Sequence, residues 1–88
     1  MVIKNLVDNA IEANIEDYQR ECKNYYLYTD VEKSSKTKKD SRDFRHYATG
    51  SLKAFSAIED TLIRIFPEWN EYITERLVKE RLKVIDKS

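Results

Sequence analysis

The chain has 88 residues and a formal net charge of zero, with 16 basic and 16 acidic side chains. A chain of this length forms one domain, spanning residues 1–88, with a small core. Its hydrophobic fraction of 41% and charged fraction of 36% exclude an intrinsically disordered chain and are typical of amphipathic helices. The balanced charge argues against a protein dedicated to gripping a polyanion.

The numbers of turn residues and cysteines restrict the fold class and the expected location of the protein. The sequence has one glycine and one proline, too few for the many turns of a sheet protein, so it predicts an all-α fold. The single cysteine, Cys22, cannot form an internal disulfide, and no cationic start followed by an apolar run marks a signal peptide or a membrane span. We therefore expect a cytoplasmic protein with no membrane partner.

The first predicted element is a helix over about residues 3–28. Apolar side chains recur there every three or four residues and form one face. These are Val7, Ile11, Ile15, Tyr18, Cys22 and Tyr25. Because Cys22 lies on this face, we expect it to be a buried thiol that behaves as a small hydrophobe rather than a nucleophile.

A polar segment over about residues 29–41 follows, and Val31 is its only apolar member. Such a segment has no apolar face to bury, so it predicts a long mobile loop. Two alternatives remain open. Thr29 and Glu32 have the spacing of a capping box that starts an extra turn, or the first helix extends into the segment because Lys and Glu tolerate helix well.

The second predicted helix covers about residues 42–65, with Asp40 or Ser41 as its N-cap. A heptad-like apolar stripe supports it. The stripe consists of Phe44, Ala48, Ser51, Phe55, Ile58, Leu62 and Ile65. Gly50 lies between small residues of this stripe, which predicts the close approach of another helix rather than a phosphate-binding loop.

A tight corner at Pro67 separates this helix from a third, over about residues 67–85. Proline disfavours α conformation in the residue before it and fits a first helical turn. The third apolar face combines Trp69, Tyr72 or Ile73, Leu77, and Val84 or Ile85. The sequence thus predicts a three-helix bundle with a long polar loop after the first helix and a proline corner after the second.

Catalytic and metal chemistry find little support. His46 is the only histidine, and nucleophilic catalysis needs a base together with an orienting group. Asp43 and His46 form a D-x-x-H pair, but helical metal sites require several such units. We expect a non-enzymatic protein with no catalytic residue, no metal ligand and no cofactor site.

The aromatic content favours protein binding. Six tyrosines, three phenylalanines and one tryptophan exceed what a small core needs, and such side chains dominate interface hot spots. The candidate protein-binding residues are Tyr25, Tyr26, Tyr28, Trp69 and Tyr72. We expect a regulator, adaptor or inhibitor that binds another protein, with homodimer formation as a further expectation. The alternative is that these rings cover the end of the bundle and the base of the loop.

Nucleic-acid binding is the second interpretation. It would use Lys33, Lys36, Lys38, Lys39, Arg42, Arg45 and Lys53. Four acidic residues are interleaved with the first six of these between residues 30 and 46, which leaves a local charge of only +2. A second basic region at the C-terminus contains Arg76, Lys79, Arg81, Lys83 and Lys87 against Glu80 and Asp86, for a net charge of +3. Such segregation of charge along a chain also suits head-to-tail contacts between protein surfaces.

Overall fold

The computed structural model describes residues 2–87, and the side chains of residues 3–85. Its elements are α1 (Val2–Lys33), α2 (Lys38–Ile65), a 3₁₀ turn η1 (Pro67–Trp69) and α3 (Asn70–Lys87). The prediction of an all-α chain is confirmed. Within the described residues no helix is long and apolar enough to cross a membrane.

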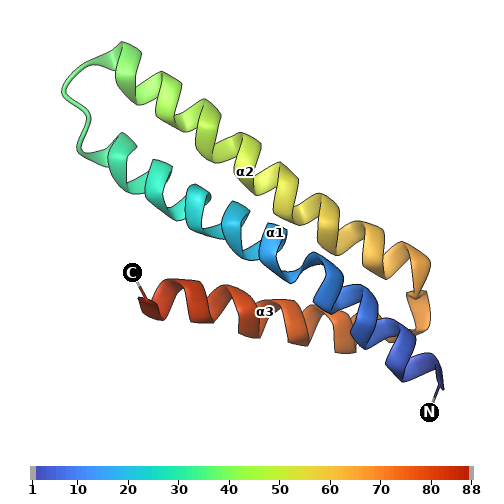
Figure 1. Cartoon of the computed structure of the whole chain (residues 1–88). Helices are drawn as coiled ribbons and strands as arrows, with labels where there is room; N and C mark the ends of the chain where they lie inside the picture. Colours follow the sequence, from blue (N-terminus) through green and yellow to red (C-terminus); the bar gives the residue numbers. More distant parts are fainter. Residues whose placement is uncertain (1, 88) are drawn as a thin grey trace.

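The first two helices form a long antiparallel hairpin, and α3 lies against only part of it (Figure 1). The molecule is therefore elongated, with extents of 54 × 24 × 18 Å. Helix α3 runs in the same direction as α1: Tyr72 contacts Asp8, and Glu80 contacts Gln19 further along both helices. The loop end of the hairpin projects beyond the end of α3.

The core lies where all three helices meet. Its fully buried side chains come from the predicted stripes of α1 and α3, and α2 adds two nearly buried ones. They are Val7, Ile11, Tyr18, Cys22, Phe55, Leu62, Ile73 and Leu77. This confirms most of the apolar periodicity on which the helix predictions depend, because side chains three and four residues apart share a helix face.

The predicted loop over residues 29–41 is wrong in length, because the break between the helices covers only Ser34–Thr37. Helix α1 extends five residues beyond position 28, and α2 begins at Lys38 instead of 42. Two features explain the extension. Glu32 forms an ion pair with Arg45 of α2 at 2.8 Å, and Val31 is half-buried, so the polar segment gains a partner helix instead of water.

The predicted caps also differ from the observed ones. Thr37 is the N-cap of α2, and its hydroxyl accepts a hydrogen bond from the Asp40 backbone N–H at 3.1 Å. Asp40 therefore lies in the first turn instead of capping it, where its carboxylate suits the positive end of the helix. Thr29 does not start a turn, because its hydroxyl donates to the Tyr25 carbonyl within α1.

The proline corner is confirmed. The Phe66 backbone N–H bonds the Leu62 carbonyl at 3.0 Å, and the Trp69 N–H bonds the Phe66 carbonyl at 2.9 Å. Pro67 occupies the first position of η1, where its missing N–H costs nothing. The third α-helix consequently begins at Asn70, three residues later than predicted.

Gly50 does not provide a close helix approach within the chain. A Cβ placed on it would meet nothing within 4 Å. The residue is exposed on α2, so the predicted packing role is wrong for the single chain.

Candidate functional site

Three aromatic side chains form a cluster near the loop end of the hairpin. Tyr28 of α1 stacks on Phe44 of α2 with ring centroids 6.4 Å apart, and it lies 5.4 Å from the ring of Tyr47. Phe44 and Tyr47 contact each other at 6.2 Å. Tyr47 remains 55% exposed. We call these three residues the aromatic cluster.

The cluster lies in a part of the hairpin that we call the arm, residues 23–53. All of these residues are described. Ala48 and Ser51 are the buried residues among them, and Tyr25 and Tyr26 pack partly buried against the core. The arm has two helices where the rest of the molecule has three, because α3 runs beside only one half of the hairpin (Figure 1). Tyr28 and Phe44 of the aromatic cluster are half-buried in the arm, and Tyr47 stays exposed.

A second apolar feature lies at the opposite end of the hairpin, between α1 and α2. It is a groove of about 280 Å³. Its lining consists of Ala10, Asn14, Ala57, Ile58, Thr61, Leu62 and Ile65. Ile65 is 60% exposed, and Leu6 and Ile3 are also exposed, one and two turns before Ala10 on α1.

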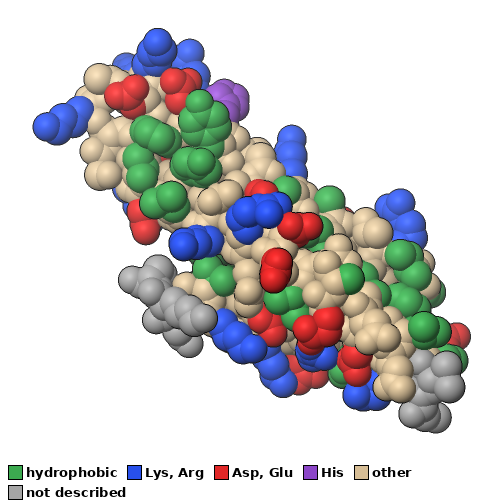
Figure 2. All heavy atoms as spheres, viewed as in Figure 1, with side chains coloured by type: hydrophobic (Ala, Val, Ile, Leu, Met, Phe, Trp, Pro, Cys, Tyr) green, Lys and Arg blue, Asp and Glu red, His purple; other side chains and the backbone are tan. Residues whose placement is uncertain are grey.

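The groove and the aromatic cluster lie on the same side of the hairpin. On α1, Ala10 and Tyr28 are eighteen residues apart; on α2, so are Tyr47 and Ile65. Eighteen residues are five complete turns, so each pair shares one helix face. Figure 2 shows hydrophobic side chains gathered at both ends of the hairpin on one side of the molecule. We call this side the hairpin face.

Helix α3 lies on the other side. On α1 the residues that bond to α3 include Asp8, Glu12 and Gln19. Each is about half a turn away from Ala10 around the helix axis at 100° per residue. The hairpin face is therefore the side of α1 and α2 that α3 leaves uncovered.

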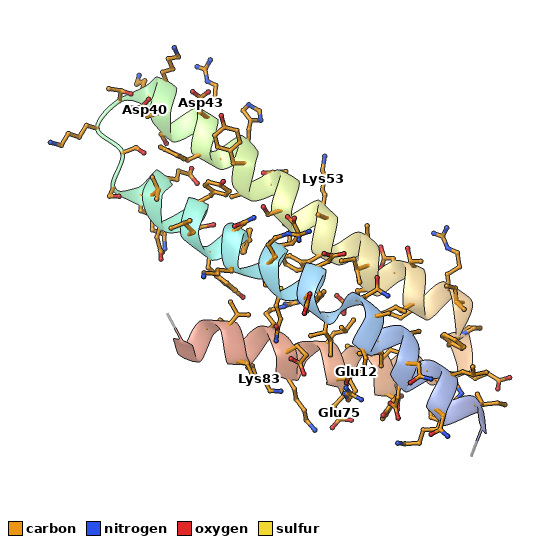
Figure 3. The ribbon with its side chains drawn as sticks, in the orientation of Figure 1. Glu12, Asp40, Asp43, Lys53, Glu75 and Lys83 are labelled. Atoms are coloured by element: carbon orange, nitrogen blue, oxygen red, sulfur yellow. The ribbon has the colours of Figure 1, made fainter. Side chains whose placement is uncertain are left out.

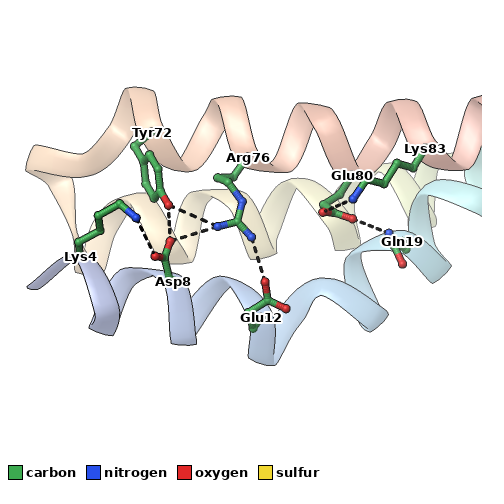
Figure 4. A network of polar contacts seen from close by, with 8 residues as sticks. All are labelled: Lys4, Asp8, Glu12, Gln19, Tyr72, Arg76, Glu80 and Lys83. Carbon is green, nitrogen blue, oxygen red and sulfur yellow. Dashed lines mark hydrogen bonds and ion pairs between the residues drawn. The ribbon is translucent and has the colours of Figure 1, made fainter. Parts of the chain in front are cut away.

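A polar network fixes α3 to α1 (Figure 4). The Tyr72 hydroxyl donates to the Asp8 carboxylate, and Arg76 bonds Asp8 at 3.1 Å and Glu12 at 3.0 Å. Lys4 adds an ion pair to Asp8 at 3.2 Å. The hydrogen bond from Tyr72, together with the nearby cations, lowers the pKa of Asp8. These groups are committed to holding the helices together.

A second polar group lies partly within the core. Arg81 donates to the Tyr18 hydroxyl at 3.0 Å, lies 3.7 Å from Glu59, and places its guanidinium 5.0 Å from the centre of the Phe55 ring. Burial raises the pKa of Tyr18 to about 12 and also raises the pKa of the Cys22 thiol and of Glu59. Cys22 is buried as predicted, and its raised pKa disfavours the reactive thiolate.

The five predicted protein-binding residues fall in three places. Tyr28 belongs to the aromatic cluster. Tyr25 and Tyr26 pack edge to face at 5.2 Å and lie partly buried against the core, as do Trp69 and Tyr72 at the corner. Four of the five rings therefore lie against the core, which is closer to the alternative interpretation that the rings are structural covers. The fifth, Tyr28, lies in the aromatic cluster.

Sequence reasoning missed Phe44 and Tyr47 as members of the candidate surface. Phe44 was assigned to the core stripe, and Tyr47 was not assigned to any face. Their spacing of three residues on α2 was the available signal. This spacing could be interpreted only with the observed start of α2 at Lys38. With the predicted loop over residues 29–41, Phe44 would lie in the first turn of the helix and have no partner on α1.

The predicted nucleic-acid residues gather mainly at the loop end, which we call the tip. A hollow of about 400 Å³ there is lined by Ser35, Lys36, Thr37, Lys38, Ser41, Arg42 and Arg45. Lys33 and Lys39 are exposed close to it along the chain, and Arg45 is engaged by Glu32. Lys53 lies apart, projecting from the middle of α2, while Asp40 and Asp43 lie near the tip (Figure 3).

The zero net charge conceals a strong asymmetry. Residues 23–53 contain eight basic and four acidic side chains, for a net charge of +4. The rest of the chain contains eight basic and twelve acidic side chains, for a net charge of −4. The arm therefore has a positive net charge, and the remainder of the molecule has a negative net charge of the same size.

In the described part of the chain, no group of three or more His, Cys, Asp and Glu side chains is placed to hold a metal ion. His46 is exposed beside the aromatic cluster in sequence. Comparison with protein-family models, with curated proteins and with solved structures finds no match.

Proposed function

We propose that the protein is a small non-enzymatic regulator, adaptor or inhibitor that binds another protein through its hairpin face. The observation that carries the proposal is the aromatic cluster, where Tyr47 is 55% exposed, on an arm that projects beyond the end of α3 (Figure 1). Tyrosine combines a large rigid contact area with a hydroxyl that hydrogen-bonds at a wet interface, so it is enriched in binding hot spots.

The shape of this face favours a macromolecular partner over a small ligand. Small-molecule sites are concave and bury most of the ligand surface. Here the apolar features are an aromatic cluster and a shallow groove at opposite ends of an elongated hairpin. A protein surface, or a helix lying along the hairpin, is long enough to contact both.

A capture experiment with matched variants tests this proposal. The tagged protein is used to capture proteins from an extract of its source cells, with Tyr47→Ala as the binding variant and Leu52→Ala as the control. Leu52 is also exposed on the arm, but it lies about 140° away around α2. We expect Tyr47→Ala to lose the captured protein and Leu52→Ala to retain it. Equal capture by both variants would reject the hairpin face as the binding surface.

Nucleic-acid binding is the second candidate, favoured by the net charge of +4 on the arm and by the hollow that Lys36, Lys38, Arg42 and Arg45 line. Phosphate contacts release counterions, so such binding weakens steeply with salt. Replacing Lys38, Lys39, Arg42 and Arg45 with Gln would abolish a salt-sensitive affinity for a DNA or RNA oligonucleotide. Micromolar affinity in physiological salt, lost in this variant, would rank this function first.

A further inference from the structure

We infer that a second copy of this chain occupies the hairpin face, in an antiparallel dimer with the aromatic cluster of each copy over the apolar groove of the other. The inference rests on the proposed function, because it names a partner for the same face. The hairpin face has an apolar feature near each end, and the arm and the remainder of the molecule have opposite net charges. A partner for this face must therefore offer apolar surface at both positions and the complementary charge beside each part. The chain itself has both properties.

The electrostatic argument selects the antiparallel arrangement. Each copy has +4 on the arm and −4 on the remainder. A two-fold axis that reverses the long direction places the arm of each copy beside the acidic part of the other, and it does so twice. A parallel arrangement would place like charges together at both ends, which costs energy and disfavours that register.

The geometry of the face supports the same register. If Tyr47 lies over the groove near Thr61 of the partner, the two-fold axis passes close to Ala54. Gly50, Ala54 and Ala57 are small residues around that point, and a Cβ on Gly50 meets nothing within the chain. Two α2 helices can therefore approach closely across the axis, since small side chains reduce the interhelical distance.

The available area is sufficient for a stable dimer. Helix α2 has 28 residues and is thus about 42 Å long, and two packed helices span roughly 20 Å. Such a face offers roughly 800 Å² per copy, which matches the area of a standard specific interface. Burying it would also supplement the small core that an 88-residue chain can form.

Analytical ultracentrifugation between 1 and 100 μM tests the dimer. We expect a dimer whose dissociation constant rises about tenfold or more in Tyr47→Ala, because this change removes an aromatic ring that fills the partner's groove. Ala57→Arg should give a monomer at 100 μM, since it places a long cation at the interface. The controls Leu52→Ala and Thr49→Arg, which change exposed residues on other sides of α2, should stay within about twofold.

Disulfide trapping tests the antiparallel register in a Cys22→Ala background. Gly50→Cys and Ala57→Cys are almost symmetric about Ala54, so mixing the two variants should give the mixed disulfide in preference to either homodisulfide. Circular dichroism confirms that each variant is folded. A monomer at 100 μM for the unmodified chain, or homodisulfides at position 50 as the main product, would overturn the inference.

The two proposals fail separately. If the unmodified protein is monomeric and Tyr47→Ala still loses the captured protein, the dimer is rejected and the hairpin face remains a binding surface for a different protein. If the unmodified protein is a dimer and Tyr47→Ala captures as much protein from the extract, binding of a different protein to the hairpin face is rejected and the dimer is kept.

Discussion

The three-helix part of the molecule and the arm are built from the same two helices, yet they differ in what lies beside them. Where α3 is present, residues such as Tyr18, Ile73 and Leu77 are fully buried, and polar networks join the helices. In the arm, α1 and α2 have only each other, and Tyr47 and Leu27 stay more than half exposed. The two regions thus differ in burial, because the core lies in the three-helix part and large side chains of the arm stay at the surface.

The largest expected difference between the two regions is in core energetics. Leu77→Ala should lower the free energy of unfolding by about 2–5 kcal/mol, because it leaves a cavity where all three helices meet. Tyr47→Ala on the arm should cost less than about 1 kcal/mol, since its ring is largely in water already. Urea denaturation of both variants at low micromolar concentration measures the contrast. Similar losses would contradict the division into two regions.

The pH dependence of stability provides a second test of the three-helix part. Burial raises the pKa of Tyr18 to about 12, whereas a tyrosine in the unfolded chain titrates near 10. The folded state therefore keeps the neutral phenol, and this stability is fully present below pH 10 and is lost as the pH rises toward 12. The loss should be on the order of 2 kcal/mol.

The Tyr18→Phe variant isolates this contribution. It cannot ionise at this position, so its stability should fall less steeply between pH 10 and 12 than that of the unmodified protein. Parallel chemical denaturation at several pH values measures the two slopes. Identical slopes would show that Tyr18 is not the group responsible.

A smaller effect concerns the start of α2 in the arm. Thr37→Ala should lower the free energy of unfolding by about 1 kcal/mol, because the Asp40 backbone N–H loses its acceptor. Ser41→Ala should change it by less than about 0.5 kcal/mol, because Ser41 lies inside the helix. Thermal denaturation monitored by circular dichroism compares them, and a larger loss for Ser41→Ala would restore the cap predicted from the sequence.

The smallest expected effect is a gain in stability. Gly50 is exposed in a regular helix with open space around its Cα, so Gly50→Ala should stabilise the monomer by about 0.5–1 kcal/mol through reduced freedom of the unfolded chain. The measurement is made below 1 μM to exclude self-association. A loss of stability there would indicate a close contact at this position within the single chain.

The sequence predicted the helices better than their ends. Buried positions such as Ile11, Phe55 and Leu77 follow helical spacing, and this pattern depends on local geometry alone. The predicted length of the loop was wrong because Glu32 forms an ion pair with Arg45 of α2 across the hairpin and Val31 is half-buried. Propensity carries no information on such distant partners.

The candidate site was predicted only in part for a related reason. Aromatic excess predicted a binding surface that includes Tyr28, but it did not separate rings that cover the core from rings left at the surface. That separation depends on which side of the hairpin α3 covers. The asymmetry in charge was visible in the sequence, yet its meaning depends on an elongated shape that composition does not show.

Native-state hydrogen exchange, resolved by residue, tests the central claim most directly. In dilute solution, the amides between Tyr28 and Lys33 and between Asp40 and Tyr47 should exchange at least about tenfold faster than those around Ile11, Phe55 and Leu77, because the arm opens without unfolding the core. Protection in the arm should then rise with protein concentration as a second copy covers it. Equal protection in both regions of the dilute protein would contradict the account.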